Sequence, residues 1–190
     1  MSPNQLSSLT GKLLVAMPTM PDPRFAHSVI FMCAHSEEGA MGIMVNKFMG
    51  AMKLSEILDA SVLQDADKSQ RLPIHYGGPV ESSRGFVLHS SDYHCENATM
   101  VVNQAFSLTA TLDVLVEINH GAGPELALLG LGYSGWGPGQ LEEEIVENSW
   151  LVADAITDLV FIEKDENKWD QALEQIGVDP KTLSGSSGNA

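Results

Sequence analysis

Histidine and cysteine are the residues best suited to metal binding or nucleophilic catalysis, and this sequence has six histidines and two cysteines. Cys33 and His35 are two residues apart in an apolar stretch, so they would face the same side of a strand. His94 and Cys95 are adjacent. Neither pair has the spacing of a known zinc motif, and a cysteine within an apolar strand is usually inert. We therefore expect no metal site, no disulfide framework, and histidines that are bonded internally or exposed.

A glycine-rich segment at 132–139 precedes a predicted helix that begins at Gln140. Glycine-rich loops at helix N-termini can hold phosphate groups. Here, three glutamates at 142–144 occupy the first helical turn, where they complement the helix dipole and would repel an anion. The lysine and the Ser/Thr of a P-loop are missing. The glycines instead predict a tight backbone path that lets Tyr133 and Trp136 pack closely.

No complete catalytic motif is present. The segment GYSG at 132–135 is one residue short of the GxSxG nucleophile elbow. The glutamates at 142–144 and Glu147 could in principle serve acid–base chemistry, but consecutive helical residues point around most of the circumference, so at most two converge. We expect a solvated acidic face. The sequence therefore assigns no catalytic residue and no cofactor.

Short apolar runs between turn residues predict strands, and apolar residues at helical spacing predict helices. The first three predicted strands are too close together to be joined by helices, and the runs at 29–34 and 43–45 suit a hairpin. We therefore expect a mixed-sheet α+β domain rather than an all-parallel sheet. The predicted strands are 12–17, 28–35, 43–47, 74–76, 85–89, 99–103, 125–131 and 158–162. The predicted helices are 54–62, one capped by Thr109 or Thr111, 140–148 and 167–176, and a polar segment at 65–71 is expected to be mobile.

Length and composition indicate one globular domain. The chain has 190 residues, a mass of 20.4 kDa and 44% hydrophobic residues, which is ordinary for a folded protein. We assign residues 1–178 to a single domain and residues 179–190 to a flexible C-terminal tail.

The net charge of −15 is spread unevenly. Residues 1–95 carry seven basic and nine acidic residues, whereas residues 96–190 carry three basic and sixteen acidic ones. Because nucleic-acid binding depends on Lys and Arg at phosphates, we expect no direct binding to DNA or RNA. The longest apolar run, Val29–Ala34, is far shorter than the ~20 residues needed to cross a bilayer. We expect a cytoplasmic protein with no membrane contact.

Three sequence blocks, taken together and in this order, resemble the AlgH/YqgE family of bacterial proteins. The blocks are GxLLVAMP at 11–18 with DPxF at 22–25, SV at 28–29, GAMG at 39–42 and NK at 46–47; GGPV at 77–80 with RGFVLH at 84–89; and GLGYSGWxxGQLExEI at 130–145 with NSWL at 148–151. The resemblance covers residues 9–177. Lys47-Phe48 stands where the family often has Arg-Pro, and this difference would lengthen the strand before it by a residue.

The resemblance implies an α+β fold whose mixed, largely antiparallel sheet curls into a pseudo-barrel with flanking helices. The family name comes from a proposed role as a transcriptional regulator. The resemblance supplies no established activity, substrate or catalytic residue, so no functional residue is transferred to this sequence.

We expect a non-catalytic binding or regulatory protein that acts through an unknown protein partner or small ligand; the oligomeric state stays open. The alternative is an enzyme with a pocket built from the strands of His35 and Asn46 and the glycine-rich loops. Trp150 is expected to be buried, and Trp136 to be partly exposed at the edge of a cleft. The candidate binding residues are His35, Asn46, Gly77, Gly78, His89, Trp136, Gln140 and Glu142.

Overall fold

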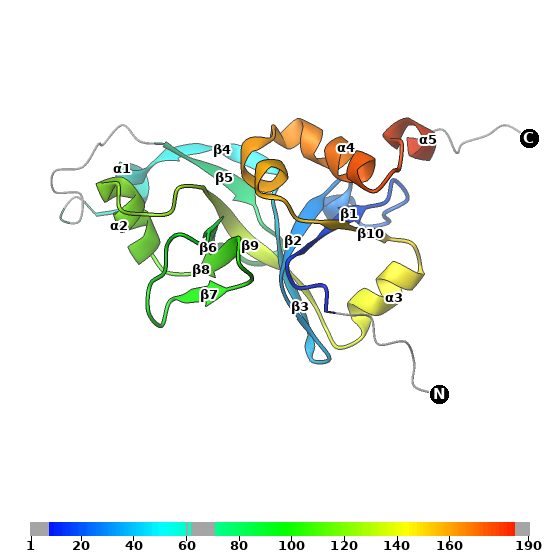
Figure 1. Cartoon of the computed structure of the whole chain (residues 1–190), viewed down its shortest axis with the longest axis horizontal. Helices are drawn as coiled ribbons and strands as arrows, with labels where there is room; N and C mark the ends of the chain where they lie inside the picture. The colour runs from blue at the N-terminus through cyan, green and yellow to red at the C-terminus, as the bar shows by residue number, and fades with distance from the viewer. Residues whose placement is uncertain (1–7, 60, 62–70, 185–190) are drawn as a thin grey trace, which may run out of the picture.

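The structure is a computed structural model that describes residues 8–59, 61 and 71–184 (Figure 1). Ten strands form one sheet. The strands are β1 Lys12–Ala16, β2 Val29–Ser36, β3 Gly39–Met44, β4 Phe48–Lys53, β5 Arg71–Tyr76, β6 Val80–Ser90, β7 Thr99–Val101, β8 Phe106–Thr109, β9 Ala127–Trp136 and β10 Trp150–Asp154.

Seven helical segments connect or cover these strands in the described chain, and none of them has the length and apolar character needed to cross a membrane. The helical segments are η1 Pro23–Phe25, α1 Leu54–Ile57, α2 Asp113–His120, α3 Gln140–Val146, η2 Asp158–Ile162, α4 Asp165–Gln175 and α5 Pro180–Ser184.

The sheet runs in the order β10-β1-β2-β3-β9-β6-β8-β7, and β5 and β4 branch from β9. Pairing between the described strands is antiparallel except between β5 and β9. The long strand β9 joins the two halves, because its first residues pair with β6 and its last ones with β3. The sheet curls into a half-barrel with flanking helices (Figure 1). This confirms the expected α+β class and the largely antiparallel, curled sheet.

Strands β1 and β2 are buried on both faces, which explains their continuous apolar sequences. Side chains alternate between the faces of a strand. Leu13 and Val15 therefore pack in the core that contains Trp169 of α4, whereas Leu14 and Ala16 pack in the core that contains Leu141 of α3. Helices α4 and α3 thus cover opposite faces of this half of the sheet (Figure 1). A third core lies between helices α1 and α2 and strands β5, β6 and β9.

Two glycine segments cross at very short range. Gly132 has a φ of +71°, and a Cβ there would lie 2.3 Å from the carbonyl oxygen of Gly78. A Cβ on Gly77 would lie 2.2 Å from the oxygen of Gly132. Only glycine allows both the positive φ and this approach. The tight backbone path predicted from the glycines is therefore present, but its first part is strand, because β9 continues to Trp136.

The segment 158–162 was expected to be the last strand, and this prediction is wrong. It forms the π-helical turn η2, and β10 is the last strand instead. A short apolar run such as DLVFI does not distinguish a buried strand from a buried helical turn by its pattern alone. Strand β8 and strand β4 were also missed.

Helix α2 begins at Asp113 rather than at either threonine. Thr109 belongs to β8, and Thr111 Oγ1 donates a hydrogen bond to Asp113 Oδ2 instead of capping the backbone. Helix α1 ends at Ile57, earlier than expected. Part of the expected helix at 54–62 and nearly all of the segment at 65–71 lie outside the described residues.

Two smaller expectations also change. Strand β3 ends at Met44, so Lys47 does not lengthen it, and Phe48 begins β4. The C-terminal segment 179–190 begins with the short helix α5. Residues 185–190 lie outside the described part.

Candidate functional site

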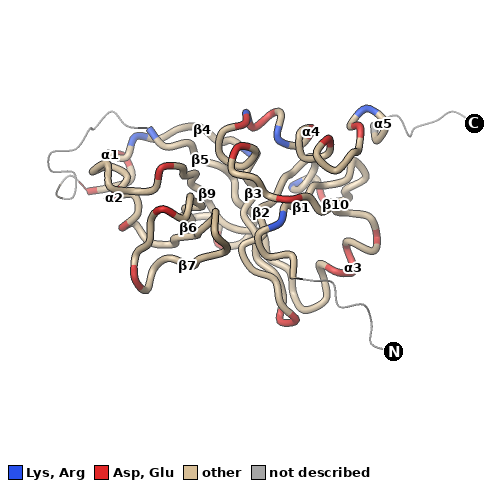
Figure 2. The backbone as a smooth tube through the Cα atoms, viewed as in Figure 1, with Lys and Arg blue, Asp and Glu red and all other residues tan. Residues whose placement is uncertain are grey.

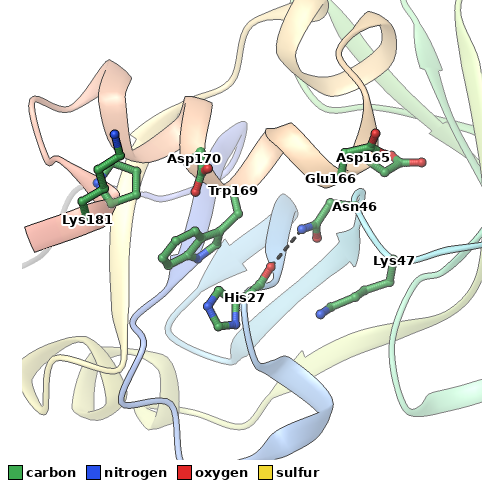
Figure 3. A pocket seen from close by; sticks show the side chains of 9 residues that line it. His27, Asn46, Lys47, Asp165, Glu166, Trp169, Asp170 and Lys181 are labelled. Carbon is green, nitrogen blue, oxygen red and sulfur yellow. Dashed lines mark hydrogen bonds between the residues drawn. The ribbon is translucent and has the colours of Figure 1, made fainter. Parts of the chain in front are cut away.

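A groove lies beside helix α4, against the turn before β2 and the turn after β3. Its volume is about 540 Å³. Carboxylates from α4 face a lysine of the opposite turn across it, and a tryptophan forms part of its wall (Figure 3). The lining residues are His27, Asn46, Lys47, Asp165, Glu166, Trp169, Asp170, Pro180 and Lys181.

Asn46 fixes the shape of one wall of this groove. Its Nδ2 donates to the carbonyl oxygen of His27 over 2.9 Å, and its Oδ1 accepts from the backbone N–H of Val29 over 2.8 Å. His27 has a φ of +53°, which is uncommon for a residue with a side chain. The His27 ring packs edge-on against Trp169, with 4.6 Å between the ring centroids. The asparagine therefore holds a strained turn against the aromatic wall.

Lys47 is held on the same wall. Its Nζ donates to the carbonyl oxygen of Ala26 over 2.5 Å. Partial burial lowers the pKa of Lys47, because the charged form loses hydration. The ammonium group is thus already fixed in position before any ligand arrives.

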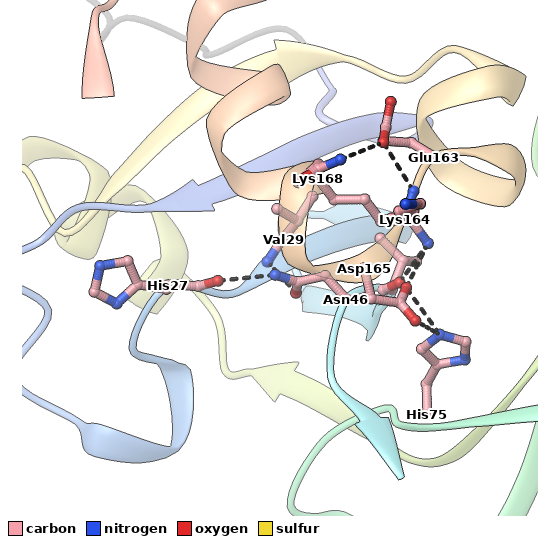
Figure 4. A network of polar contacts seen from close by, with 10 residues as sticks. His27, Val29, Asn46, His75, Glu163, Lys164, Asp165 and Lys168 are labelled. Atoms are coloured by element: carbon pink, nitrogen blue, oxygen red, sulfur yellow. Dashed lines mark hydrogen bonds and ion pairs between the residues drawn. The ribbon is translucent and has the colours of Figure 1, made fainter. Parts of the chain in front are cut away.

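A buried polar network lies behind the groove and anchors the start of α4 (Figure 4). Lys168 Nζ bonds to Asp165 Oδ1 over 2.9 Å and donates to the carbonyl oxygen of Val45 over 2.8 Å. His75 Nε2 lies 3.1 Å from both carboxylate oxygens of Asp165. Since a carboxylate only accepts, Nε2 carries a proton. His75 Nδ1 is buried without a hydrogen-bond partner among the described residues.

The network sets the charges of its members. Burial lowers the pKa of Lys168, and the bond to Asp165 offsets this only in part. Burial acts to raise the pKa of Asp165, but the hydrogen bonds from His75 and Lys168 outweigh it, so the pKa lies below its ordinary value. Asp165 therefore stays ionised while it lines the groove.

Of the eight candidate binding residues, only Asn46 lines this groove. His35 lies at the far end of the β2–β3 hairpin from Asn46. Asn46 therefore lines this groove without His35.

Four other candidates gather around α3 on the opposite face of the sheet. His35 Nδ1 accepts the backbone N–H of Leu9 over 3.0 Å, which leaves the proton on Nε2, and Nε2 lies 2.8 Å from Glu142 Oε1. Gln140 bonds to Glu144 over 2.9 Å. The backbone bond at Glu142 and the bond from His35 hold the pKa of the Glu142 carboxyl below its usual value. The pair of His35 and Glu142 ties α3 to the sheet, whereas the bond of Gln140 to Glu144 lies within the helix.

Trp136 is buried, with 7% of its surface exposed, so the expectation of a partly exposed ring is wrong. Trp150 is buried as predicted. The two indole N–H groups both donate to Glu144 Oε2, over 2.9 and 2.8 Å. Glu142 and Glu144 are therefore structural partners, whereas Glu143 and Glu147 are exposed, so the expected solvated acidic face holds for only two of its four glutamates. A buried indole needs an acceptor, and this need was the signal available in the sequence.

His89 lies apart from both regions and is fully buried. Its Nδ1 donates to the carbonyl oxygen of Ser90, so its Nε2 accepts from the Thr109 hydroxyl over 2.9 Å. Thr109 in turn bonds to Thr99 over 2.8 Å. Burial lowers the pKa of His89. This series of hydrogen bonds lies within the fold. Gly77 and Gly78 are likewise buried in the glycine crossing.

Both cysteines are free. Cys33 is buried, and burial raises the pKa of its thiol to about 12, so it is unsuited to act as a nucleophile. Within the described residues, no group of three or more His, Cys, Asp or Glu is arranged to hold a metal ion.

Most residues of this groove were not predicted from the sequence. Asp165 and Lys168 are three residues apart, on the same helical face as Trp169 and Leu173. The predicted helix began at residue 167, so Asp165 fell outside it. A charged pair on the buried face of an amphipathic helix was the signal that could have revealed the network.

Comparison with known proteins identifies the family to which this chain belongs. The sequence model of the AlgH-like family matches residues 13–181. This chain belongs to the AlgH-like family. A UPF0301 protein of Cereibacter sphaeroides is 48% identical over 182 residues, covering 96% of this chain and 99% of that protein. A UPF0301 protein of Ruegeria pomeroyi is 51% identical over 183 residues, with the same coverage.

Two solved structures agree with the fold. The solution structure of the AlgH protein from Pseudomonas aeruginosa matches with a TM-score of 0.76 and 36% identity, covering 100% of both chains. A crystal structure of a Corynebacterium diphtheriae protein matches with a TM-score of 0.71 and covers 100% of this chain and 95% of that one. At 21% identity, the second match supports the fold alone. The resemblance of the sequence to the AlgH/YqgE family is confirmed.

Proposed function

We propose that this AlgH-like protein is a non-catalytic binding protein of regulatory type, and that its ligand site is the groove beside α4. The observation that carries the proposal is a groove whose walls are already fixed internally. Asn46 and Lys47 are bonded to the turn at 26–28, and Asp165 is bonded to His75 and Lys168. A preorganised site loses less entropy when it binds.

The lining chemistry favours a ligand with a positive group beside an aromatic or apolar part. Asp165, Glu166 and Asp170 supply three carboxylates, against the two lysines Lys47 and Lys181, and Trp169 supplies an aromatic wall. The ligand is a small molecule or the side chain of a partner protein. The unpaired cysteines support a reducing, cytoplasmic setting.

A regulatory protein of this composition would act through another molecule rather than through DNA. The net charge is −15, and three of the ten Lys and Arg residues lie in residues 96–190. Fluorescence anisotropy with genomic fragments tests this point. Binding tighter than about micromolar with a steep salt dependence would contradict it.

A matched pair of probes tests the groove. Tryptamine and indole-3-propionate share the indole ring but carry opposite charges. We expect tryptamine to shift groove resonances in NMR spectra, and we expect Asp170→Asn to weaken this binding several-fold. Glu143→Gln on α3, which is exposed and far from the groove, is the matched control. Equal binding of both probes, no binding of either, or equal loss in the control would argue against this site.

A further inference from the structure

A second groove lies along helix α4 on the side away from the first one. Its volume is about 610 Å³, and it shares no lining residue with the first groove. At 3.6 residues per turn, Lys164, Gln171 and Glu174 point away from Asp165 and Trp169. The lining residues are Ile156, Asp158, Leu159, Ile162, Glu163, Lys164, Gln171, Glu174 and Gln175.

The π-helical turn η2 forms the other wall of this second groove. The backbone N–H of Glu163 donates to the carbonyl oxygen of Asp158 over 2.8 Å, which is the five-residue spacing of a π turn. The turn buries Leu159 and Val160 but leaves Ile162 62% exposed. Such turns are rare and occur frequently at functional sites.

Three apolar residues line the second groove. Ile156 is 50% exposed just before η2, Ile162 is exposed at its end, and Leu159 is a buried member of the same lining. A single exposed isoleucine on a surface needs no explanation. Two of them that line one groove give it an apolar part that a partner could cover.

Most of the charged side chains that line this second groove are acidic. Asp158, Glu163 and Glu174 contribute three carboxylates, against the single cation of Lys164. Glu163 Oε1 accepts from the Lys164 N–H and from Asn167 Nδ2, both over 2.9 Å, and these bonds fix the carboxylate in place. Residues 158–175 hold six acidic and two basic residues, and acidic positions predominate along η2 and α4 (Figure 2).

We propose that this second groove docks a cationic, amphipathic segment of a partner protein. Apolar side chains of the segment lie between Ile156 and Ile162, and its Lys or Arg residues pair with Asp158, Glu163 and Glu174. Complementary charge speeds encounter and excludes acidic partners, and an apolar groove receives the apolar face of a helix. The partner site is separate from the ligand groove and does not depend on it.

A second copy of this chain does not suit the groove. A symmetric pair would place the same surface against itself, so carboxylates would face carboxylates. Each copy also carries a net charge of −15, which opposes self-association.

The test uses a labelled amphipathic peptide of leucine and lysine, about four helical turns long. Two matched peptides replace all lysines with glutamate or all leucines with serine. Fluorescence anisotropy should detect binding of the Leu/Lys peptide only. Ile162→Ser should weaken binding about ten-fold, as loss of a central apolar contact does, and Glu174→Gln should weaken it less and reduce its salt dependence.

Control variants separate this site from general attraction to an acidic protein. Val146→Ser removes another exposed apolar side chain, which is 76% exposed on α3, and Glu143→Gln removes another exposed carboxylate. Both should leave binding unchanged. Equal losses in the controls, equal binding of the Glu peptide, or no binding would overturn the proposal. Sedimentation that reveals self-association abolished by Ile162→Ser would overturn it in favour of a second copy.

Discussion

Helices α3 and α4 pack on opposite faces of the same strands, and each region combines tryptophan, carboxylate and histidine. Around α3, the indoles of Trp136 and Trp150 both donate to Glu144, and His35 pairs with Glu142. Around α4, Trp169 donates instead to the backbone carbonyl of Ala16 over 2.8 Å. In the α3 region, the carboxylates therefore bond to side chains of the fold itself.

The α4 region satisfies its indole with backbone and leaves Glu166 and Asp170 to line a groove. The comparison teaches that residue types alone do not separate a structural cluster from a binding site. A structural cluster differs from a binding site in that its polar side chains are already bonded to partners within the fold.

The largest expected effect is a loss of stability from substitutions in the α3 region. Trp136→Ala and Trp150→Ala should each lower the free energy of unfolding by about 3–5 kcal/mol, because each removes a buried ring and leaves Glu144 with one donor fewer. Urea denaturation measures both. If Trp136→Ala costs less than about 1 kcal/mol while Trp150→Ala costs the full amount, the Trp136 ring is not an essential part of the α3 region.

Two single substitutions compare a polar side chain of α4 with one of α3. Lys168→Met keeps much of the apolar stem but leaves the Val45 carbonyl and Asp165 without their buried donor. We expect a loss of about 2 kcal/mol in unfolding free energy. Gln140→Met, which removes an exposed donor to Glu144, should cost about 0.5 kcal/mol. Equal losses in unfolding free energy would show that the buried network behind the groove stabilises the protein no more than an exposed bond on α3 does.

Acid titration extends the comparison to charge. A carboxyl whose folded pKa is lowered contributes stability above its unfolded pKa, and this contribution is lost as the pH falls through the folded pKa. Asp165→Asn should therefore destabilise the protein at pH 7 by about 1–2 kcal/mol, and the difference from wild type should shrink below pH 4. Glu142→Gln should show the same trend at about 0.5 kcal/mol, because 36% of the Glu142 side chain is exposed and solvent screens it. Denaturation curves at pH 7, 5 and 3 measure both, and a gap that widens in acid would contradict the assigned charges.

The smallest effect is expected from a chelator, which should not change the stability of either region. Neither region assembles three metal-binding side chains among the described residues, so a chelator should leave the melting temperature unchanged, and elemental analysis should find no stoichiometric zinc or iron. About one metal ion per chain would contradict this prediction for both regions. Variants of His35 and His75 would then identify the region that holds it.

The sequence by itself determined the elements whose signal lies in neighbouring residues. Continuous apolar runs predicted β1 and β2, because strands covered on both faces need apolar side chains at every position. Amphipathic spacing predicted α3 and α4, and the three motif blocks predicted the family and, through it, the curled sheet. The charge asymmetry carries the expectation that no DNA is bound, and this expectation stays a prediction.

Only the tertiary structure decided which polar groups meet. Trp136, Glu144 and Trp150 lie on three different elements, so the burial of Trp136 depends on contacts that no local pattern encodes. The same holds for Asp165 and His75, which are ninety positions apart. The turn at 158–162 shows the same limit in the backbone, because its apolar side chains suit either a strand or a helical turn, and packing against α4 and the sheet selected the π turn that exposes Ile162.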